Sequence, residues 1–140
     1  MSQNLIFIPM LAHILLIFAL YIRLGIVKSS AIKTGAVDRN KAALNTKAWP
    51  ESVVKVSNNI GNQFESPMLF YGLTIIIYLT NNVNSVVIAL MGLYAASRYV
   101  HAYIHVTSNY VPFRFKAFLV GMLILLVLSI WQLLNLILSI

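Results

Sequence analysis

Long apolar stretches, almost free of charge, constrain this chain more than any other feature of its sequence. Residues 5–27 and 117–138 are each long enough to cross roughly 30 Å of hydrocarbon as a helix. Only 9% of the residues are charged and 60% are hydrophobic, whereas about a quarter of the residues in soluble domains are charged. The sequence therefore predicts an all-α integral membrane protein.

The same composition excludes several other kinds of protein. The 140 residues suit one domain, residues 1–140, with no room for a separate soluble catalytic module. Without cysteine, the chain has no disulfide, thiolate nucleophile or sulfur-ligated metal. The net charge is +7, and the basic residues cluster beside a membrane segment. Their position is explained by membrane topology and by contact with anionic lipid, so no nucleic acid is expected as a partner.

Turn and charge signals between the apolar stretches predict a bundle of four spanning helices. The first apolar run is too long for a signal peptide, so we expect a retained helix. The second helix is expected over residues 50–80, kinked at Pro67 because proline lacks a backbone N–H. The third begins near Ser85 and ends at Val111, since a residue before proline resists the helical conformation.

The connection after the first helix sets the predicted orientation in the membrane. Gly35 and residues 38–40 indicate a loop. Because this connection is short and rich in lysine, the positive-inside rule places it in the cytoplasm and both termini outside. The expected location is a bacterial inner membrane. The basic residues of the connection are Lys28, Lys33, Arg39, Lys41, Lys47 and Lys55.

Two sets of polar side chains share helix faces at the cytoplasmic ends of the second and third helices. The first set recurs at i, i+4 and i+7: Asn58, Asn62 and Glu65. The second recurs at i, i+3 and i+7: Arg98, His101 and His105. Arg114 begins the fourth helix at a similar depth. One interpretation is contact between helices, with Glu65 paired to Arg98; the other is a site for a polar or anionic ligand beside a lipid-facing groove.

A metal site is a minor alternative for the same residues. His101 and His105 could bind one ion with Glu65 as the carboxylate. His13 is expected about 12 Å away in depth, too far to ligate the same ion, and we interpret it as a neutral side chain bonded to a neighbouring helix. We therefore expect no resident metal.

The order and spacing of these motifs resemble those of the MAPEG family, the membrane-associated proteins in eicosanoid and glutathione metabolism. The first motif is N-x-x-E at Asn62 and Glu65 before Pro67, within the run N-Q-F-E-x-P-x-L-F-Y. The second is R-x-x-H-x-x-x-H-x-x-x-N from Arg98, and Pro112-x-Arg114 follows it. The sequences of both runs are most similar to those of bacterial members of the family.

The resemblance implies a homotrimer of four-helix subunits that binds glutathione, as co-substrate, in a pocket open to the cytoplasm. It also implies transfer of glutathione to a lipophilic small molecule, or reduction of a hydroperoxide. Asn62 and Glu65 would then hold the amino and carboxylate groups of glutathione, while Asn58, Arg98, His101 and His105 would complete the binding site. Arg114 would be the catalytic residue, because a cation near a thiol stabilises the thiolate.

The chain departs from the pattern of glutathione-using members at four positions. Asn58 and Gly61 stand where basic residues precede the glutamate, His105 replaces a tyrosine, and Phe115 replaces a serine or similar residue. Glutathione is a net anion, so fewer cations predict weaker binding. The alternative is therefore a non-catalytic lipid-binding or structural membrane protein of the same fold.

Overall fold

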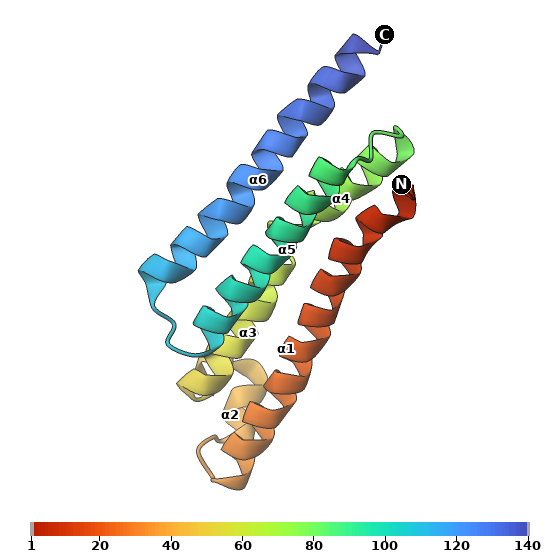
Figure 1. The fold of residues 1–140 in the computed structure, drawn as a ribbon. Coiled ribbons are helices and arrows are strands. Elements are labelled where there is room, and N and C mark those ends of the chain that lie inside the picture. The colour runs from red at the N-terminus through yellow and green to blue at the C-terminus, as the bar shows by residue number, and fades with distance from the viewer. Residues whose placement is uncertain (1, 140) are drawn as a thin grey trace.

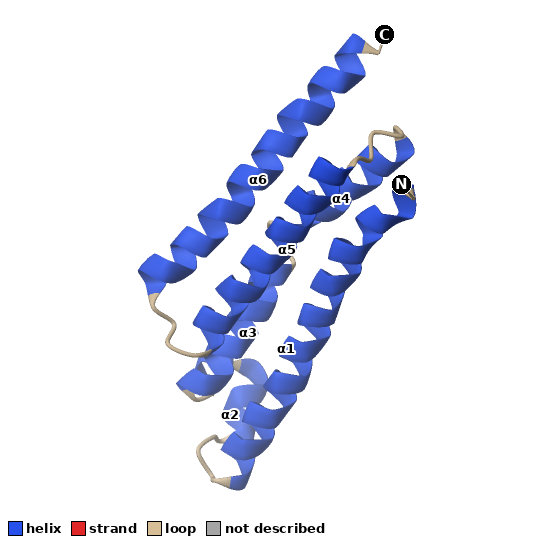
Figure 2. Ribbon diagram, in the orientation of Figure 1, coloured by secondary structure: helices blue, strands red, loops and turns tan. Residues whose placement is uncertain are grey.

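The described part of the chain, residues 2–139 of a computed structural model, is helical and contains no strand (Figure 2). Short loops join the helices. In chain order the elements are η1 Gln3–Ile6, α1 Phe7–Lys33, α2 Arg39–Leu44, η2 Thr46–Ala48, α3 Glu51–Gln63, α4 Pro67–Leu79, α5 Ser85–Val106 and α6 Val111–Leu138.

The long helices run side by side in alternating directions (Figure 1). Helix α5 lies at the centre of the bundle and packs against α1, α3 and α6. Both ends of the described chain lie at the same end of the bundle as the turn between α4 and α5, while α2 and the loop before α6 lie toward the other. The predicted all-α fold is confirmed for the described residues.

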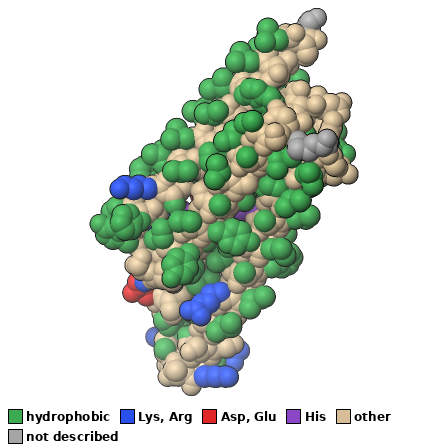
Figure 3. All heavy atoms as spheres, viewed as in Figure 1, with side chains coloured by type: hydrophobic (Ala, Val, Ile, Leu, Met, Phe, Trp, Pro, Cys, Tyr) green, Lys and Arg blue, Asp and Glu red, His purple; other side chains and the backbone are tan. Residues whose placement is uncertain are grey.

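The exterior of the bundle is largely apolar. Apolar side chains cover most of the face in Figure 3, and the Lys and Arg side chains on that face lie near the middle of the bundle or toward the end away from the chain ends. Of the described helices, α1 together with η1, and α6, are each long and apolar enough to cross a membrane. Helices α3 and α4 are too short to cross a membrane alone, because each has 13 residues, about 20 Å. Helix α5 is long enough but less apolar, because it carries Arg98 and two histidines.

The predicted kink at Pro67 is a complete break between two helices. Helix α3 ends at Gln63 and α4 begins at Pro67, so the expectation of one helix over residues 50–80 was wrong. Proline at the first position of a helix needs no N–H donor, which makes Pro67 a helix start. Phe64 consequently leaves the buried stripe of α3 and is 51% exposed.

Three other helix boundaries differ from the prediction. Helix α1 continues to Lys33 because Val27 and Ala31 are still buried in the core. Helix α5 ends at Val106, and Val111 begins α6 instead of ending α5.

The predicted loop at residues 38–40 contains a helix start. The carboxylate of Asp38 accepts hydrogen bonds from the backbone N–H groups of Asn40 and Lys41. This is an N-cap, so Asp38 starts the short helix α2.

Two apolar clusters form the core. The polar residues His13, Gln63 and Arg98, described below, each lie in the sequence between residues of one cluster and residues of the other. The cluster near the chain ends includes Phe70, Leu73, Met91, Tyr94 and Leu125. The cluster at the other end includes Leu16, Leu20, Val53, Val56 and Ala102.

Helices α5 and α6 approach each other closely at Gly121. A Cβ atom at this position would lie 2.8 Å from the Ser97 hydroxyl and 3.3 Å from the Tyr94 ring. The Ser97 hydroxyl cannot move freely, because it donates a 2.7 Å hydrogen bond to the Tyr94 carbonyl. A larger residue at Gly121 must therefore separate the two helices or break that bond.

We expect Gly121→Ala to be less stable than Gly92→Ala by about 1–3 kcal/mol, the usual cost of overpacking. Both variants gain about 1 kcal/mol of helix propensity, and Gly92, in α5, has open space around its Cβ position. The measurement is thermal unfolding in detergent. Equal stability of the two variants would contradict the close contact.

Candidate functional site

A polar layer, fully buried except for Tyr71, lies between the two apolar clusters. The Nε2 atom of His13, on α1, lies 3.0 Å from the side-chain carbonyl oxygen of Gln63, on α3. The Nδ1 atom of His13 lies 2.6 Å from the Tyr71 hydroxyl, on α4. Because the carbonyl can only accept, His13 carries its proton on Nε2 and accepts from Tyr71 at Nδ1. The predicted hydrogen bond between His13 and a neighbouring helix is confirmed.

Gln63 is the centre of this layer. Its Oε1 atom accepts from the Nε and Nη2 atoms of Arg98 at 3.3 and 3.2 Å. Its Nε2 atom donates to Asn59 Oδ1 at 2.8 Å, and Asn59 donates to the carbonyl of Ala102 at 3.1 Å. Gln63 thus links side chains from α1, α3 and α5.

Arg98 also binds the end of α3. Its Nη2 atom donates to the backbone carbonyl of Asn62 at 2.9 Å. That carbonyl belongs to the last turn of a helix, where such groups lack helical partners and where a cation is favoured by the helix dipole. The ion pair with Glu65, which one of the two interpretations of the sequence included, does not form within residues 2–139. Arg98 is 1% exposed.

A cavity of about 270 Å³ opens at the break between α3 and α4. It is enclosed by the break, by α5 and by the first turns of α6. Its lining residues are Asn62, Glu65, Ser66, His101, Val111, Arg114, Phe115 and Phe118.

Opposite charges line the cavity, and a hydrogen-bond acceptor without a partner in the described residues is buried in its wall. Arg114 donates to Asn109 Oδ1 at 2.6 Å, and its backbone carbonyl lies 3.1 Å from Nδ1 of His101. His101 must donate through Nδ1, so a neutral His101 has an acceptor at Nε2. This Nε2 atom is buried and has no hydrogen-bond partner within the described residues. With the Glu65 carboxylate, the cavity suits a ligand that carries both an amino group and an anionic group.

Four of the residues predicted from the sequence meet in this cavity: Asn62, Glu65, His101 and Arg114. Three others lie outside it. Asn58 is exposed on α3, Arg98 lies behind the cavity wall, and His105 is buried beside Asn62, with Nδ1 3.4 Å from the Asn62 amide.

Sequence reasoning missed Asn59, Gln63 and Tyr71. A signal for two of them was present. Asn59 and Gln63 follow the buried positions Val53 and Val56 at helical spacing, so they are polar residues in phase with an apolar stripe. Only the fold brings Tyr71 to His13.

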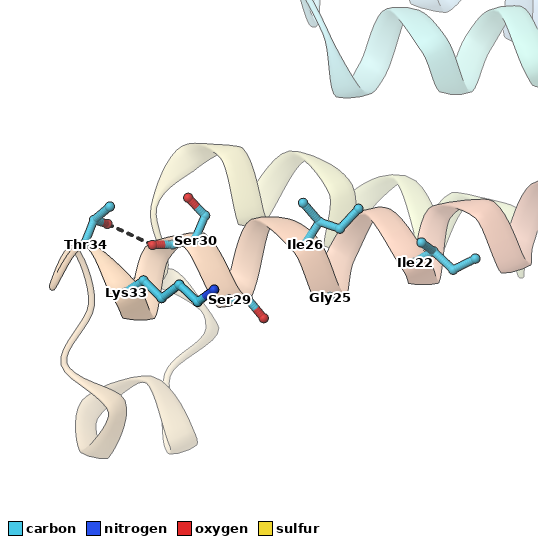
Figure 4. A pocket seen from close by; sticks show the side chains of 7 residues that line it. All are labelled: Ile22, Gly25, Ile26, Ser29, Ser30, Lys33 and Thr34. Atoms are coloured by element: carbon cyan, nitrogen blue, oxygen red, sulfur yellow. Dashed lines mark hydrogen bonds between the residues drawn. The ribbon is translucent and has the colours of Figure 1, made fainter.

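The other features of the described residues do not form a comparable site. No three of the His, Asp and Glu side chains in residues 2–139 lie close enough to ligate one metal ion. A hollow of about 700 Å³ runs along the exposed face of α1 from Ile22 to Thr34 (Figure 4). It is formed by one helix, and Lys33 is its only ionisable side chain.

Comparison with known proteins identifies one family. A family model described as the MAPEG family matches residues 6–134. This range includes every residue that lines the cavity. Searches of the curated proteins and of the solved structures return no match.

We expect Tyr71→Phe to destabilise the protein by about 0.6 kcal/mol, and by no more than about 1.7 kcal/mol, the range measured for hydrogen bonds inside membranes. The variant leaves Nδ1 of His13 buried without its donor. Tyr78→Phe is the control, because Tyr78 packs against Phe7 and its hydroxyl makes no hydrogen bond within residues 2–139. Unfolding in detergent with a graded denaturant measures both, and equal effects would argue against the polar layer.

Proposed function

Because the chain belongs to the MAPEG family, we propose that it is an integral membrane enzyme that uses glutathione as co-substrate. The reaction is transfer of glutathione to a lipophilic electrophile or reduction of a lipophilic hydroperoxide. It takes place at the cytoplasmic leaflet. The observation that carries this proposal is the cavity in which Glu65, His101 and Arg114 meet.

Each polar group of the cavity has a role in this proposal. The Glu65 carboxylate binds the amino group of glutathione, and the Asn62 amide binds a carboxylate. His101, which is held at Nδ1 by the Arg114 carbonyl, forms part of the cavity wall. The charge of Arg114 stabilises the thiolate of glutathione, and the thiolate is the form that attacks an electrophile or a peroxide oxygen.

The proposed topology has four spans with both termini outside the cytoplasm of a bacterial cell. Helices α3 and α4 cross in series as one span, because neither is long enough alone. The break between them carries polar backbone groups, which are tolerated at membrane depth only where they are buried in protein or line a water-filled cavity. We further propose a homotrimer, as in the resemblance on which this function rests.

A second candidate function is lipid binding without catalysis. A wholly apolar groove of about 520 Å³ between α1 and α4 favours it. Its lining includes Met10, Phe18, Phe64, Met68 and Ile75. Native mass spectrometry separates the two functions. Retained lipid together with no response to glutathione favours lipid binding, and release of lipid without loss of glutathione binding favours the enzyme.

We expect the purified protein to show the ultraviolet absorbance of a thiolate when glutathione is added, and Arg114→Ala to abolish it. Lys116→Ala is the matched control, because Lys116 is a nearby cation on α6 that lies outside the cavity lining. It should keep the absorbance. Calorimetry provides a second measurement of binding. Absence of both signals in the unsubstituted protein would rule out the proposed enzyme.

A further inference from the structure

We infer that Gln63 is a positioning residue for the cavity. It acts through Arg98, which holds the segment from Asn62 to Ser66 that forms one wall of the cavity. Gln63 does not line the cavity. Its predicted effect on glutathione binding rests on the proposed function, whereas its predicted effect on the shape of the cavity does not.

The first step of the argument is the arrangement of donors around Gln63. Its one carbonyl oxygen accepts from His13 and twice from Arg98, and its amide donates to Asn59. The side chain is fully buried. Within a membrane protein, an acceptor that serves a buried guanidinium is costly to remove, because the charged donor then has no replacement in hydrocarbon.

The second step is the geometry of Arg98. Its Nη2 atom contacts both Gln63 Oε1, at 3.2 Å, and the Asn62 carbonyl, at 2.9 Å. The guanidinium is planar, so a bond through Nε to Gln63 fixes the direction in which Nη2 points. Gln63 therefore determines whether Arg98 reaches the end of α3.

The third step is the weakness of the peptide between α3 and α4. Local turns provide its backbone hydrogen bonds, from Phe64 N–H to the Gly61 carbonyl and from Met68 N–H to the Glu65 carbonyl. Proline at 67 provides no donor at all. The hydrogen bond from Arg98 to the Asn62 carbonyl connects α5 to the end of α3. We infer that it holds in place the cavity wall that carries Glu65 and Ser66.

The absence of cysteine makes a direct test of the cavity possible. Ser66→Cys places a single thiol in the cavity lining, and a trifluoromethyl label on it reports the surroundings by fluorine NMR. Three substitutions are compared in this background: Gln63→Met, Gln63→Glu and Gln132→Met. Methionine matches glutamine in length but accepts hydrogen bonds only weakly, and glutamate keeps the acceptor oxygens.

Gln132 is the matched control. It is also a buried glutamine with two side-chain hydrogen bonds, to Thr80 at 2.9 Å and to Asn82 at 3.2 Å. These lie at the end of the bundle that carries the turn between α4 and α5. A general loss of stability should therefore be similar in Gln132→Met and Gln63→Met, while an effect on the cavity should be confined to position 63.

We expect Gln63→Met to shift the fluorine signal, and Gln63→Glu and Gln132→Met to leave it where it is. In the unlabelled protein with Ser66 intact, we expect Gln63→Met to raise the Michaelis constant for glutathione about tenfold, the effect of losing one hydrogen bond to a charged group. The turnover number should change less, because Arg114 lies on α6 and keeps its contacts.

An unchanged fluorine signal in Gln63→Met would overturn the inference, and so would equal shifts in Gln63→Met and Gln132→Met. If Gln63→Met does not fold, a shifted signal in Gln63→Glu overturns it, since that variant retains the acceptor for Arg98. A protein that binds no glutathione but shows the expected fluorine pattern would refute the proposed enzyme and leave the positioning role of Gln63 in place.

Discussion

The structure depends on how one buried cation is accommodated. Arg98 sits at the centre of the bundle, and the described residues offer it no carboxylate. Neutral acceptors replace the missing anion: the side chain of Gln63 and the carbonyl of Asn62. The C-terminal end of α3, where the helix dipole favours a cation, also lies beside the guanidinium of Arg98. The same helix end therefore stabilises Arg98 and is held in place by it. This contact joins α5 to the helix end that borders the cavity.

The helical fold could be predicted because the membrane leaves few choices. Apolar stretches such as residues 5–27 and 117–138 have only one economical backbone structure in hydrocarbon. The family motif at Asn62, Glu65 and Arg114 was likewise readable, and the structure brings these three residues to one cavity. What the sequence predicted well was determined by local spacing and by hydropathy.

The remainder was determined by contacts between distant residues. At the break before Pro67, the end of α3 accepts hydrogen bonds from Arg98 on α5. The sequence alone does not pair Arg98 with Gln63 instead of Glu65. His13 was expected at a different depth from the charged layer. Gln63 joins it to that layer, because α1 and α3 pack at a relative height that hydropathy does not specify.

The segment from Asn62 to Met68, which includes the break between α3 and α4, has two faces with different surroundings. Asn62, Glu65 and Ser66 line the polar cavity, whereas Phe64 and Met68 line the apolar groove. A molecule in either space thus touches the same few backbone bonds. For two ligands bound in these spaces, the effect of each on the affinity of the other would be the same in both directions, as thermodynamic linkage requires. The polar cavity and the apolar groove therefore share the segment from Asn62 to Met68 as a common wall.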